Sequence, residues 1–523
     1  MVATLASCCF LASRILKMHP IIAISLAVLV ATYLVLQLLL HLTQSKREPR
    51  LLESTLPFLD SAIDIFKHRA NYLASLRSRY QVNIHTLRMP FQRLYVVHTS
   101  DLIQAIQSKA NATTFIPNLL DFGMLFSGMN KRSQGILAKA FGVNGNAFTM
   151  SVHKHLLSGP SLRIATSTAV DRLSASLPNN FTERGGEGLL ELVRHELTLA
   201  LTGAIYGPEN PYDDPAIEAS WCQFVPGINH LLYSPFPSLT ARKALQARSR
   251  VVNAFRKYFE TDGHLQAFPM IPEMYETNRN QGLILNEAAK MEMATSLAML
   301  SSGSNTTFWL LYQIFSNSHA LQDIRDELVD LSTDDAASDI PRRRILSLNL
   351  IKARCPTLLA MLNETLRYHS SVINIKQVQH DTILKNQYFL KKNAIVMIPG
   401  QSIHHDKDIW GPSANVFHHS RFLTPDSKRR LSSTSAFRPF GAGTTMCPGR
   451  HFSTNVICSL VAMVVLQFDL MPIDGQWIAP TTRNADLWNA MPKPDWDVNV
   501  KITRRVEEKE TEWKFVWAEA DRT

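Results

Sequence analysis

The chain has 523 residues, of which 46% are hydrophobic and 19% are charged. The charged fraction lies below the roughly 25% usual for soluble domains, and this composition excludes disordered, collagen-like and coiled-coil proteins. The net charge of +10 would suit an anionic partner. The basic residues are scattered in short groups, however, without aromatic interleaving or a zinc-finger spacing, so we expect no nucleic-acid binding.

The N-terminal region contains a predicted membrane anchor. Residues 21–42 read IIAISLAVLVATYLVLQLLLHL and include no Asp, Glu, Lys or Arg. At ~1.5 Å per residue, a helix of this length spans about 33 Å, which is enough to cross a bilayer. Bulky leucines end the run where a signal peptide would have a small-residue cleavage site, so we predict a retained anchor behind a lead over residues 1–20. Lys46, Arg47 and Arg50 follow the span and favour a cytoplasmic C-terminal side.

The rest of the chain shows mainly helical periodicity. The patterns follow in chain order: helical over 56–80, two paired strands over 82–100, helical from 101 to 368, and strands at 372–378 and 394–398. Neither a repeat nor a glycine- or serine-rich linker divides this region. We therefore predict one mainly α catalytic domain with small β-sheets over residues 43–505, followed by a peripheral tail over 506–523.

A second stretch without Asp, Glu, Lys or Arg runs from Met293 to Gln322. Its centre, residues 301–307, reads SSGSNTT, a polar cluster that is costly to place in lipid. We therefore predict a long buried core helix with polar groups at its middle, rather than a second membrane span.

The most informative segment is Phe440–Arg450, which reads FGAGTTMCPGR. Its glycines allow backbone amides to approach the sulfur of Cys447, and a thiolate so placed can ligate a metal. A lone cysteine in a tight turn is more often structural, but the pattern F-G-x-G-x-x-x-C-x-G is long and specific. It resembles the haem-binding loop of the cytochrome P450 superfamily. The resemblance implies that Cys447 is the axial thiolate ligand of haem iron and that Phe440 and Gly441 also contact the haem.

Two further motifs stand in the order expected of that superfamily. Glu364 and Arg367 form an E-x-x-R pair in a helical pattern, where residues at i and i+3 share a face. Alone this pair is a weak signal, but Arg421 follows downstream in the segment FHHSRF. The resemblance implies a structural triad of Glu364, Arg367 and Arg421 that supports the haem loop and does not act on substrate.

The polar centre of the predicted long helix resembles the oxygen-binding groove of the family. Gly303 would open space over the haem, and Thr306 would be the alcohol of the proton relay. Asn305 stands where most members carry Asp or Glu, and an amide cannot release a proton near neutral pH. Together with Phe308 and Trp309, this feature resembles the branch containing sterol 7-alpha-hydroxylases and prostacyclin synthase. We expect a fungal member that acts in secondary metabolism, with Thr306 and Asn305 at the catalytic centre.

A second departure from the family pattern is Thr445, where many members place an Arg or His that binds a haem propionate. Lys376 and Arg438 are the replacement candidates by position, although either could be a solvent-exposed charge. The adjacent histidines at 404–405 and at 418–419 lack a metal-site spacing, and we expect them to be exposed or partly buried.

By this resemblance the chain has a cytochrome P450 fold behind a single transmembrane helix, with haem b as cofactor. It would oxidise a bulky apolar molecule, such as a terpenoid, a steroid or a related secondary metabolite, with O2. No flavin or dinucleotide fingerprint occurs in the sequence. Electrons would therefore come from NADPH through a separate NADPH-cytochrome P450 reductase at the endoplasmic reticulum membrane.

The predicted substrate contacts lie in the groove and in the strand that follows Arg367: Ser301, Ser302, Val372, Ile373 and Ile375. The apolar stretch over 224–239, broken by prolines, matches the family's membrane-facing substrate entrance. Two alternatives stay open on the sequence alone, because Asn305 departs from the usual acid. One is a haem-thiolate isomerase that needs no NADPH, and the other is a non-catalytic haem-binding membrane protein.

Overall fold

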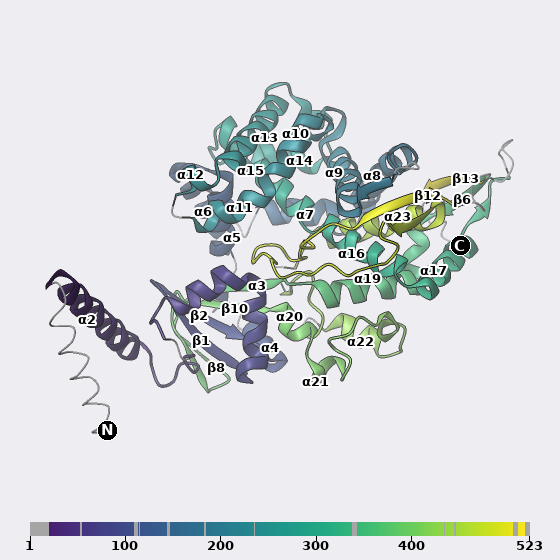
Figure 1. Ribbon diagram of the computed structural model, residues 1–523. Coiled ribbons are helices and arrows are strands. Elements are labelled where there is room, and N and C mark those ends of the chain that lie inside the picture. Colours follow the sequence, from purple (N-terminus) through teal and green to yellow (C-terminus); the bar gives the residue numbers. More distant parts are fainter. Residues whose placement is uncertain are drawn as a thin grey trace.

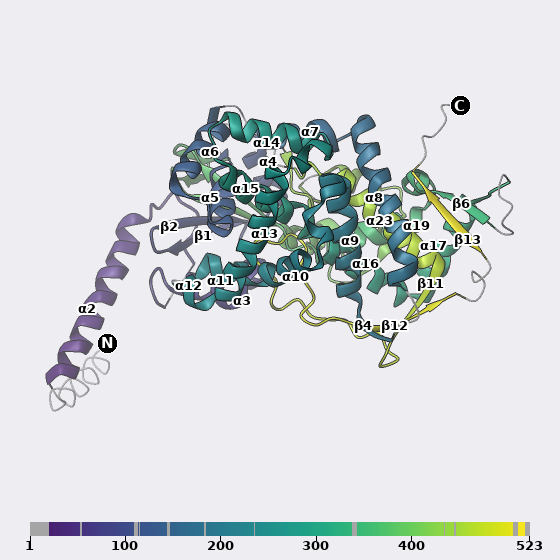
Figure 2. The ribbon, with the colours of Figure 1, turned by 90° about the horizontal axis from the view of Figure 1, so that it is seen from above.

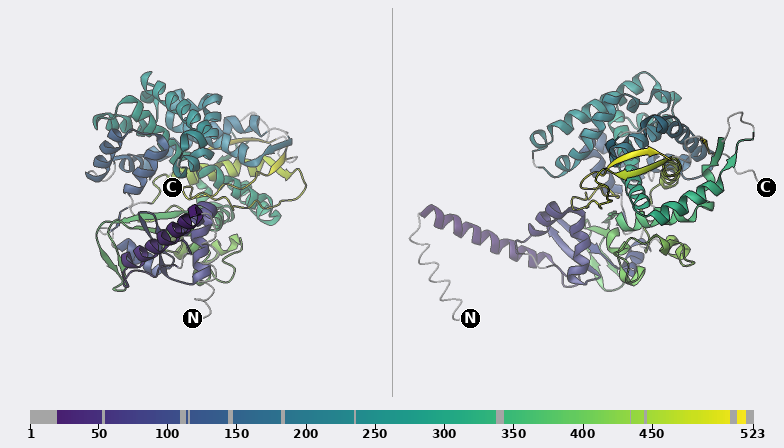
Figure 3. Two further views of the ribbon diagram at one scale, coloured as in Figure 1. Left: turned by 60° about the vertical axis from the view of Figure 1, so that its left-hand side comes forward. Right: turned by 45° about the vertical axis from the view of Figure 1, so that its right-hand side comes forward.

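A computed structural model describes the protein over residues 20–52, 55–108, 113–114, 116–143, 147–181, 185–234, 236–336, 343–433, 435–443, 446–505 and 511–517. Helix α2 (Pro20–Thr43) extends away from the body, beside the sheet region (Figures 1 and 3). Within the described residues it provides the one helix, over Ile22–Thr43, that is long and apolar enough to cross a membrane. Its most apolar stretch is not buried against the body, which is consistent with a membrane anchor.

The segment that follows α2 is bonded to the sheet region. The side chains of Arg93 and Lys391 donate to the Thr43 carbonyl, each at 2.8 Å. The same two cations pair with the buried carboxylate of Glu48, each at 3.0 Å, and the Tyr95 hydroxyl donates to it at 2.9 Å. Cations at the carboxyl end of a helix are favoured by its dipole. The anchor therefore joins the body through a fixed, charged junction.

The predicted strands come together in one five-stranded sheet. Its order is β1 (Ile84–Met89), β2 (Gln92–Val97), β10 (Ile395–Pro399), β7 (Ile373–Val378) and β3 (Thr113–Thr114). The β1–β2 pair is an antiparallel hairpin, β10 runs parallel to β2, and β7 runs antiparallel to β10. Helix α3 (Asp60–Tyr80), also expected from its apolar spacing, contacts both β1 and β10.

Helices make up most of the remaining chain and lie largely on the other side of the molecule from this sheet (Figure 1). In chain order they are α4 (Ser100–Ser108), α5 (Ile116–Ser127), α6 (Lys131–Val143), α7 (Ala147–Leu156), α8 (Gly159–Asn180), α9 (Leu189–Tyr206), α10 (Pro215–Phe224), α11 (Ile228–Tyr233), α12 (Pro237–Thr240), α13 (Arg242–Glu260), α14 (Met270–Asn280), α15 (Leu285–Leu300), α16 (Gly303–Phe315), α17 (Ser318–Leu331), α18 (Ile351–Arg354), α19 (Pro356–His369), α20 (Gly400–His404), α21 (Lys407–Trp410), α22 (Ser427–Ser432) and α23 (Arg450–Gln467). The predicted class, mainly α with small sheets, is confirmed.

Helix α16 lies at the centre of the core, where it contacts α9, α19 and α23 (Figure 2). All its residues except Gln313 are buried. Helix α23 is likewise buried along most of its length. A helix that is apolar on all sides can lie only inside a large protein or a membrane. The Met293–Gln322 region is thus core up to Phe315, as its polar centre predicts, whereas most of residues 316–322 are exposed.

The predicted single long helix is broken at its polar centre. Helix α15 ends at Leu300, α16 begins at Gly303, and α17 begins at Ser318. At the first break, the Ser301 carbonyl accepts from the side-chain amide of Asn489 at 3.1 Å, and the Ser302 hydroxyl donates to the same side chain at 2.9 Å. Side chains that compete for helix backbone groups interrupt the helical ladder.

Within the described residues, three smaller sheets complete the fold. They are β11 (Phe468–Pro472) with β12 (Asn499–Arg504) and β4 (Gly185–Gly188); β13 (Glu512–Val516) with β6 (Arg343–Ser347) and β5 (Thr333–Asp334); and β8 (Thr382–Leu384) with β9 (Tyr388–Leu390). Strand β13 pairs in parallel with β6. The described part of the expected peripheral tail is therefore hydrogen-bonded into the body.

Glu292 on α15 is a carboxyl group inside the helical core. It is 2% exposed, and the Tyr206 hydroxyl donates to it at 3.0 Å and also contacts the Ser296 hydroxyl at 2.9 Å. Burial raises the pKa of Glu292 from its ordinary 4.5 to about 7. The folded protein thus holds a neutral carboxyl group where the unfolded chain would ionise it.

We expect this group to destabilise the protein as the pH rises. Between pH 4.5 and about 7 the folded state binds the proton more tightly, so wild-type stability falls relative to a Glu292→Gln variant. The two should unfold at similar urea concentrations at pH 4, and the variant should be more stable at pH 8 by up to about 3 kcal/mol. If the variant and the wild type differed by the same free energy of unfolding at both pH values, the pKa of Glu292 would not be raised.

Candidate active site

Cys447 lies in a turn directly before helix α23. Its backbone N–H donates to the Phe440 carbonyl at 2.8 Å, closing the loop. Gly441 and Gly443 have φ values of +79° and +66°, a conformation that favours glycine. Burial raises the pKa of the Cys447 thiol, and the backbone amides of Gly449 and Arg450 oppose this by hydrogen-bonding to the sulfur. The loop therefore holds the Cys447 sulfur next to two backbone amide donors.

Lys376 and Arg438 form a cationic pair in which Arg438 is buried and Lys376 is half-buried. Arg438 is 2% exposed, and one terminal nitrogen of its guanidinium group has no hydrogen-bond partner. Burial lowers the pKa of Arg438 to about 10. Burial, followed by repulsion from Arg438, lowers the pKa of Lys376. Among the described residues no carboxylate pairs with either cation, so the pair is suited to an anionic group from outside the chain.

Arg438 is held in place by two neighbours. Its Nε donates to the Asn374 side chain at 2.7 Å, and its backbone N–H donates to Nε2 of His404 at 3.1 Å. His404 is fully buried, which corrects the expectation that it is exposed or partly buried: the helix α20 turn points it inward onto Arg438. Burial lowers the pKa of His404, which keeps its ring neutral and able to accept this bond. Thr445 lies outside the described residues.

The polar groove is held by the C-terminal loop. The Asn305 side-chain amide donates to the Met491 carbonyl at 2.9 Å, and the Thr306 hydroxyl donates to the Ser302 carbonyl at 2.8 Å. Asn305 and Thr306 are buried, at 7% and 4% exposed. A Cβ atom at Gly303 would meet no atom within 4 Å, so this glycine borders open space. Asn489 and Met491, which fix the groove, carry no local motif from which the sequence could identify them.

The structure brings Glu364, Arg367 and Arg421 together. Both oxygens of Glu364 accept from Arg367, at 2.7 and 2.8 Å, and one also accepts from Arg421 Nε at 3.1 Å. The backbone N–H of His418 donates to the same carboxylate at 2.7 Å. The remaining guanidinium nitrogens donate to backbone carbonyls, including those of Ala414 and Trp410. This network joins helix α19 to the segment that leads into the Cys447 loop.

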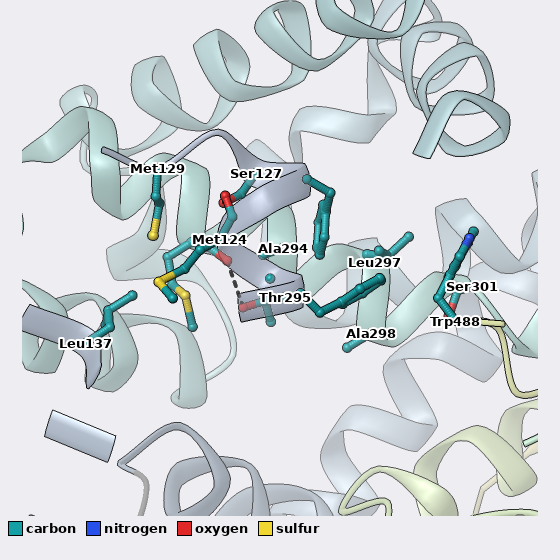
Figure 4. Close-up of a pocket in the computed structure, with 14 residues that line it drawn as sticks. Met124, Ser127, Met129, Leu137, Ala294, Thr295, Leu297, Ala298, Ser301 and Trp488 are labelled. Atoms are coloured by element: carbon teal, nitrogen blue, oxygen red, sulfur yellow. Dashed lines mark hydrogen bonds between the residues drawn. The ribbon is translucent and has the colours of Figure 1, made fainter. Parts of the chain in front are cut away.

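Two cavities meet beside the break between α15 and α16. The smaller cavity, about 170 Å³, lies between α5, α6 and α15 (Figure 4). Most of its lining is apolar, and its members include Phe122, Met124, Phe126, Met129, Leu137, Met291, Ala294, Leu297, Ala298 and Trp488. The larger cavity, about 990 Å³, is called the outer cavity because exposed residues such as Phe66 line it; its lining comes from α3, α9, α10, α11, the C-terminal loop and α16, including Ser304 and Asn305 of the groove. Ser301 lines both cavities.

The other predicted substrate residues lie elsewhere. The Ser302 hydroxyl is bonded to Asn489, and the Val372 carbonyl accepts from the Gly400 N–H at 2.7 Å. Ile373 and Ile375 are half-buried in strand β7. Within the described residues, none of these four lines either cavity. Trp488, which lines both cavities, has no sequence signal that predicts this position.

Comparison with known proteins identifies the family. A family model described as cytochrome P450 matches residues 270–496. Over 483 residues the chain is 30% identical to the cytochrome P450 monooxygenase nodJ of Hypoxylon pulicicidum, with 91% of this chain and 93% of that protein covered. The chain belongs to the cytochrome P450 family. It is an oxidoreductase, a cytochrome P450 monooxygenase, as the sequence motifs predict.

More distant cytochrome P450 relatives cover nearly the whole chain. A cytochrome P450 monooxygenase of Gibberella zeae is 24% identical over 497 residues, covering 90% of this chain and 91% of that protein. The 5-beta-cholestane-3-alpha,7-alpha-diol 12-alpha-hydroxylase of Sus scrofa is 24% identical over 501 residues, covering 88% and 93%. These matches to fungal monooxygenases and to a sterol hydroxylase confirm the predicted branch.

The residues of this cytochrome P450 fit the haem that the family implies. A haem carries two carboxylates, and the half-buried Lys376 and the buried Arg438 lack an anionic partner among the described residues. It also needs one axial ligand, and Cys447 presents a sulfur backed by amide donors. A Cβ atom at Gly303, Gly443 or Gly449 would meet no atom within 4 Å. A flat cofactor can therefore approach the backbone closely at these three glycines. Haem would thus be bound between the Cys447 loop and the groove of α16.

Replacing Arg438 by leucine should separate haem retention from the stability of the protein without haem. Leucine removes an unpaired buried cation, so the haem-free variant should unfold at an equal or higher urea concentration than wild type. The variant should release haem to apomyoglobin about tenfold faster, or more, because a buried charge pair is lost. Arg256→Leu, on the exposed face of α13, is the matched control and should change neither measurement. Unchanged haem release from the Arg438 variant would contradict a haem contact.

Proposed function

We propose that this cytochrome P450 monooxygenase inserts oxygen into a bulky apolar substrate drawn from the lipid phase, such as a terpenoid, a steroid or a related secondary metabolite. The observation that carries this proposal is the outer cavity, about 990 Å³, which includes Ser304 and Asn305 of the α16 groove, together with the smaller apolar cavity that shares Ser301 with it. Two of the three hydroxyl groups in the smaller cavity, on Ser127 and Thr295, donate to carbonyls of their own helices. The smaller cavity therefore favours hydrocarbon over charged groups.

Cys447 would ligate the haem iron, with Phe440 and Gly441 beside it, and Lys376 and Arg438 would bind the propionates. Glu364, Arg367 and Arg421 would maintain the structure around them. When bound, a haem with a thiolate ligand supplies the activation of O2 that hydroxylation requires. The protein's own part is to position the substrate, to exclude water and to deliver protons.

Thr306 and Asn305 would have different parts in proton delivery. The Thr306 hydroxyl donates to the Ser302 carbonyl, and its oxygen can accept a hydrogen bond from a water or substrate in the groove. The Asn305 amide is bonded to the Met491 carbonyl, and it cannot release a proton near neutral pH. Asn305 therefore would fix the groove to the C-terminal loop, and the Thr306 oxygen would hold a water from which a proton is passed on.

Substrate would enter from the membrane through the outer cavity. This cavity is lined by Phe66 of α3 and by Val225 and Pro226 after α10. Phe66, Phe236 and Leu239 are exposed, at 69%, 65% and 71%. Exposed apolar side chains around a cavity mouth are typical of a membrane-contact surface. We place the enzyme at the endoplasmic reticulum membrane with its catalytic domain in the cytoplasm.

Electrons would come from NADPH through a separate NADPH-cytochrome P450 reductase. The test combines full-length enzyme, reductase, NADPH and ¹⁸O₂ with a panel of apolar terpenoids and steroids. We expect an oxygenated product that carries one labelled oxygen and depends on NADPH. A product formed without NADPH and without label would overturn the proposal in favour of an isomerase. Absence of the thiolate-ligated signature in the reduced, carbon-monoxide-bound spectrum would overturn the haem assignment itself.

A further inference from the structure

Strands β1 and β2 place two arginines directly opposite each other. In the register of this hairpin Arg88 is the partner of Arg93, so both side chains project from the same face of the sheet. Like charges in this arrangement destabilise a strand pair. Burial, followed by repulsion from Arg93, lowers the pKa of Arg88. A bound anion would offset this repulsion, because it would attract both guanidinium groups.

The Arg88 guanidinium group lacks an acceptor within the described part of the chain. Its Nε and Nη1 atoms are covered, and neither finds a hydrogen-bond partner there. The group lies over the ring of Phe58, with its central carbon 5.2 Å from the ring centroid. The side chain as a whole is half-buried, so part of it stays open to a ligand. Such a group is suited to an anion that offers two acceptor oxygens.

The cations around this hairpin share one carboxylate among the described residues. Glu48 pairs with Arg93 and with Lys391, each at 3.0 Å. Glu48 also attracts Arg88, but through space and without an ion pair. Three cations therefore surround a single carboxylate, and the region keeps an excess of positive charge.

These cations lie at the end of the membrane anchor. Helix α2 leaves the body beside β1 and β2 (Figures 1 and 2). Arg93 and Lys391 donate to the carbonyl of Thr43, the last residue of α2, each at 2.8 Å. The headgroups of a bilayer begin where its apolar core ends. Phe91, in the turn of the hairpin, is fully exposed, as is typical of aromatic side chains that contact the interface of a membrane.

We propose that Arg88, together with Arg93 and Lys391, binds the phosphate group of an anionic phospholipid in the leaflet next to the catalytic domain. The lipid supplies the negative charge that the hairpin lacks, and it holds the β1–β2 turn against the membrane. A free phosphate ion has the same chemistry, but the position at the end of α2 favours a lipid. The proposal requires that α2 spans the membrane, and it is independent of the substrate and of the reaction.

The test uses the full-length holoenzyme in a neutral maltoside detergent. The two probes are dioctanoyl phosphatidylglycerol and dioctanoyl phosphatidylcholine, which share the phosphodiester and the acyl chains and differ in the positive choline group. Native mass spectrometry counts the lipids that the protein retains at each lipid concentration. We expect a single tightly bound phosphatidylglycerol, with phosphatidylcholine bound about tenfold more weakly, because the charges of the choline and the phosphate cancel.

Arg88→Leu should weaken the binding of phosphatidylglycerol by about fivefold or more, the contribution of one cation near a lipid surface. Without lipid, this variant should unfold at an equal or higher urea concentration than wild type, because it removes one of two opposed like charges. Arg504→Leu is the matched control. Arg504 is an exposed arginine on β12, at the other end of the molecule from α2, and its replacement should not change lipid binding (Figures 1 and 2).

Arg88→Gln removes the charge but keeps a polar head, and it should show the same loss of binding if the leucine variant fails to fold. Equal binding of the two lipids by wild type, or unchanged phosphatidylglycerol binding in both Arg88 variants, would overturn the proposal. Inorganic phosphate that displaced phosphatidylglycerol at an equal concentration would show a site for the free ion instead of a lipid. The carbon-monoxide spectrum should be the same in all these variants, so a failure of the proposed function would be seen separately.

Discussion

Glu364→Ala is expected to prevent the protein from accumulating in a folded state. The carboxylate accepts hydrogen bonds from Arg367, Arg421 and the His418 amide, and the two guanidinium groups are only 0% and 7% exposed. Alanine would leave two buried cations without their counter-charge. Removing one partner of a buried ion pair costs about 3–5 kcal/mol, a large part of the 5–15 kcal/mol that stabilises most domains.

The measurement is the yield of soluble protein together with the urea midpoint from circular dichroism. Glu260→Ala removes an exposed carboxylate from an i,i+4 pair with Arg256 on α13 and should cost no more than about 0.5 kcal/mol. Glu364→Gln keeps an acceptor oxygen but loses the charge, so its midpoint should lie between those of wild type and Glu364→Ala. If Glu364→Ala unfolded at the same urea midpoint as the wild type, the Glu364 network would not stabilise the fold.

Cys447→Ala is expected to abolish the thiolate-ligated carbon-monoxide spectrum and the oxidation of any substrate, while most of the fold remains. The sulfur belongs to a turn outside the main core, and the core helices α16 and α23 pack against each other independently of it. The loss should therefore appear in the spectrum and in haem content, and only slightly in the urea midpoint.

Cys458→Ala is the matched control for this variant. Cys458 is 2% exposed within α23, and burial raises its pKa to about 11, so it stays a thiol. Its replacement should cost about 1 kcal/mol of packing and leave the spectrum unchanged. If the thiolate spectrum persisted in Cys447→Ala, or was lost in Cys458→Ala, the assignment of the ligand would be wrong.

Features encoded by local pattern or by a long motif could be predicted from the sequence. The β1–β2 hairpin follows from alternating apolar residues, and the glycine-rich turn of Cys447 before a helix follows from a ten-residue pattern with five fixed positions. The break in the long core helix could not be predicted, because it depends on Asn489, which bonds to Ser301 from 188 residues away. The burial of His404 was missed for a similar reason: its partner, Arg438, lies 34 residues further along.

The residues that line the two cavities were also only partly predictable from the sequence. The predicted set includes Ser301, which lines both cavities, but the rest of the lining comes from α3, α5, α9, α11, α15 and the C-terminal loop, which meet only in the folded chain. No periodicity in the C-terminal loop marks Trp488 as different from its neighbours. Side chains that meet across such distances leave no local signal in a single sequence.

The junction between the anchor and the body limits how the enzyme can sit on its membrane. Thr43 at the end of α2 is bonded to Arg93 and Lys391, and Glu48 is buried between the same two cations. A flexible tether would let the catalytic domain roll and lift freely above the lipid surface. A charged joint of this kind transmits the inclination of the helix to the sheet instead. The thickness of the bilayer, which sets that inclination, would thereby also set how deeply the mouth of the outer cavity is immersed.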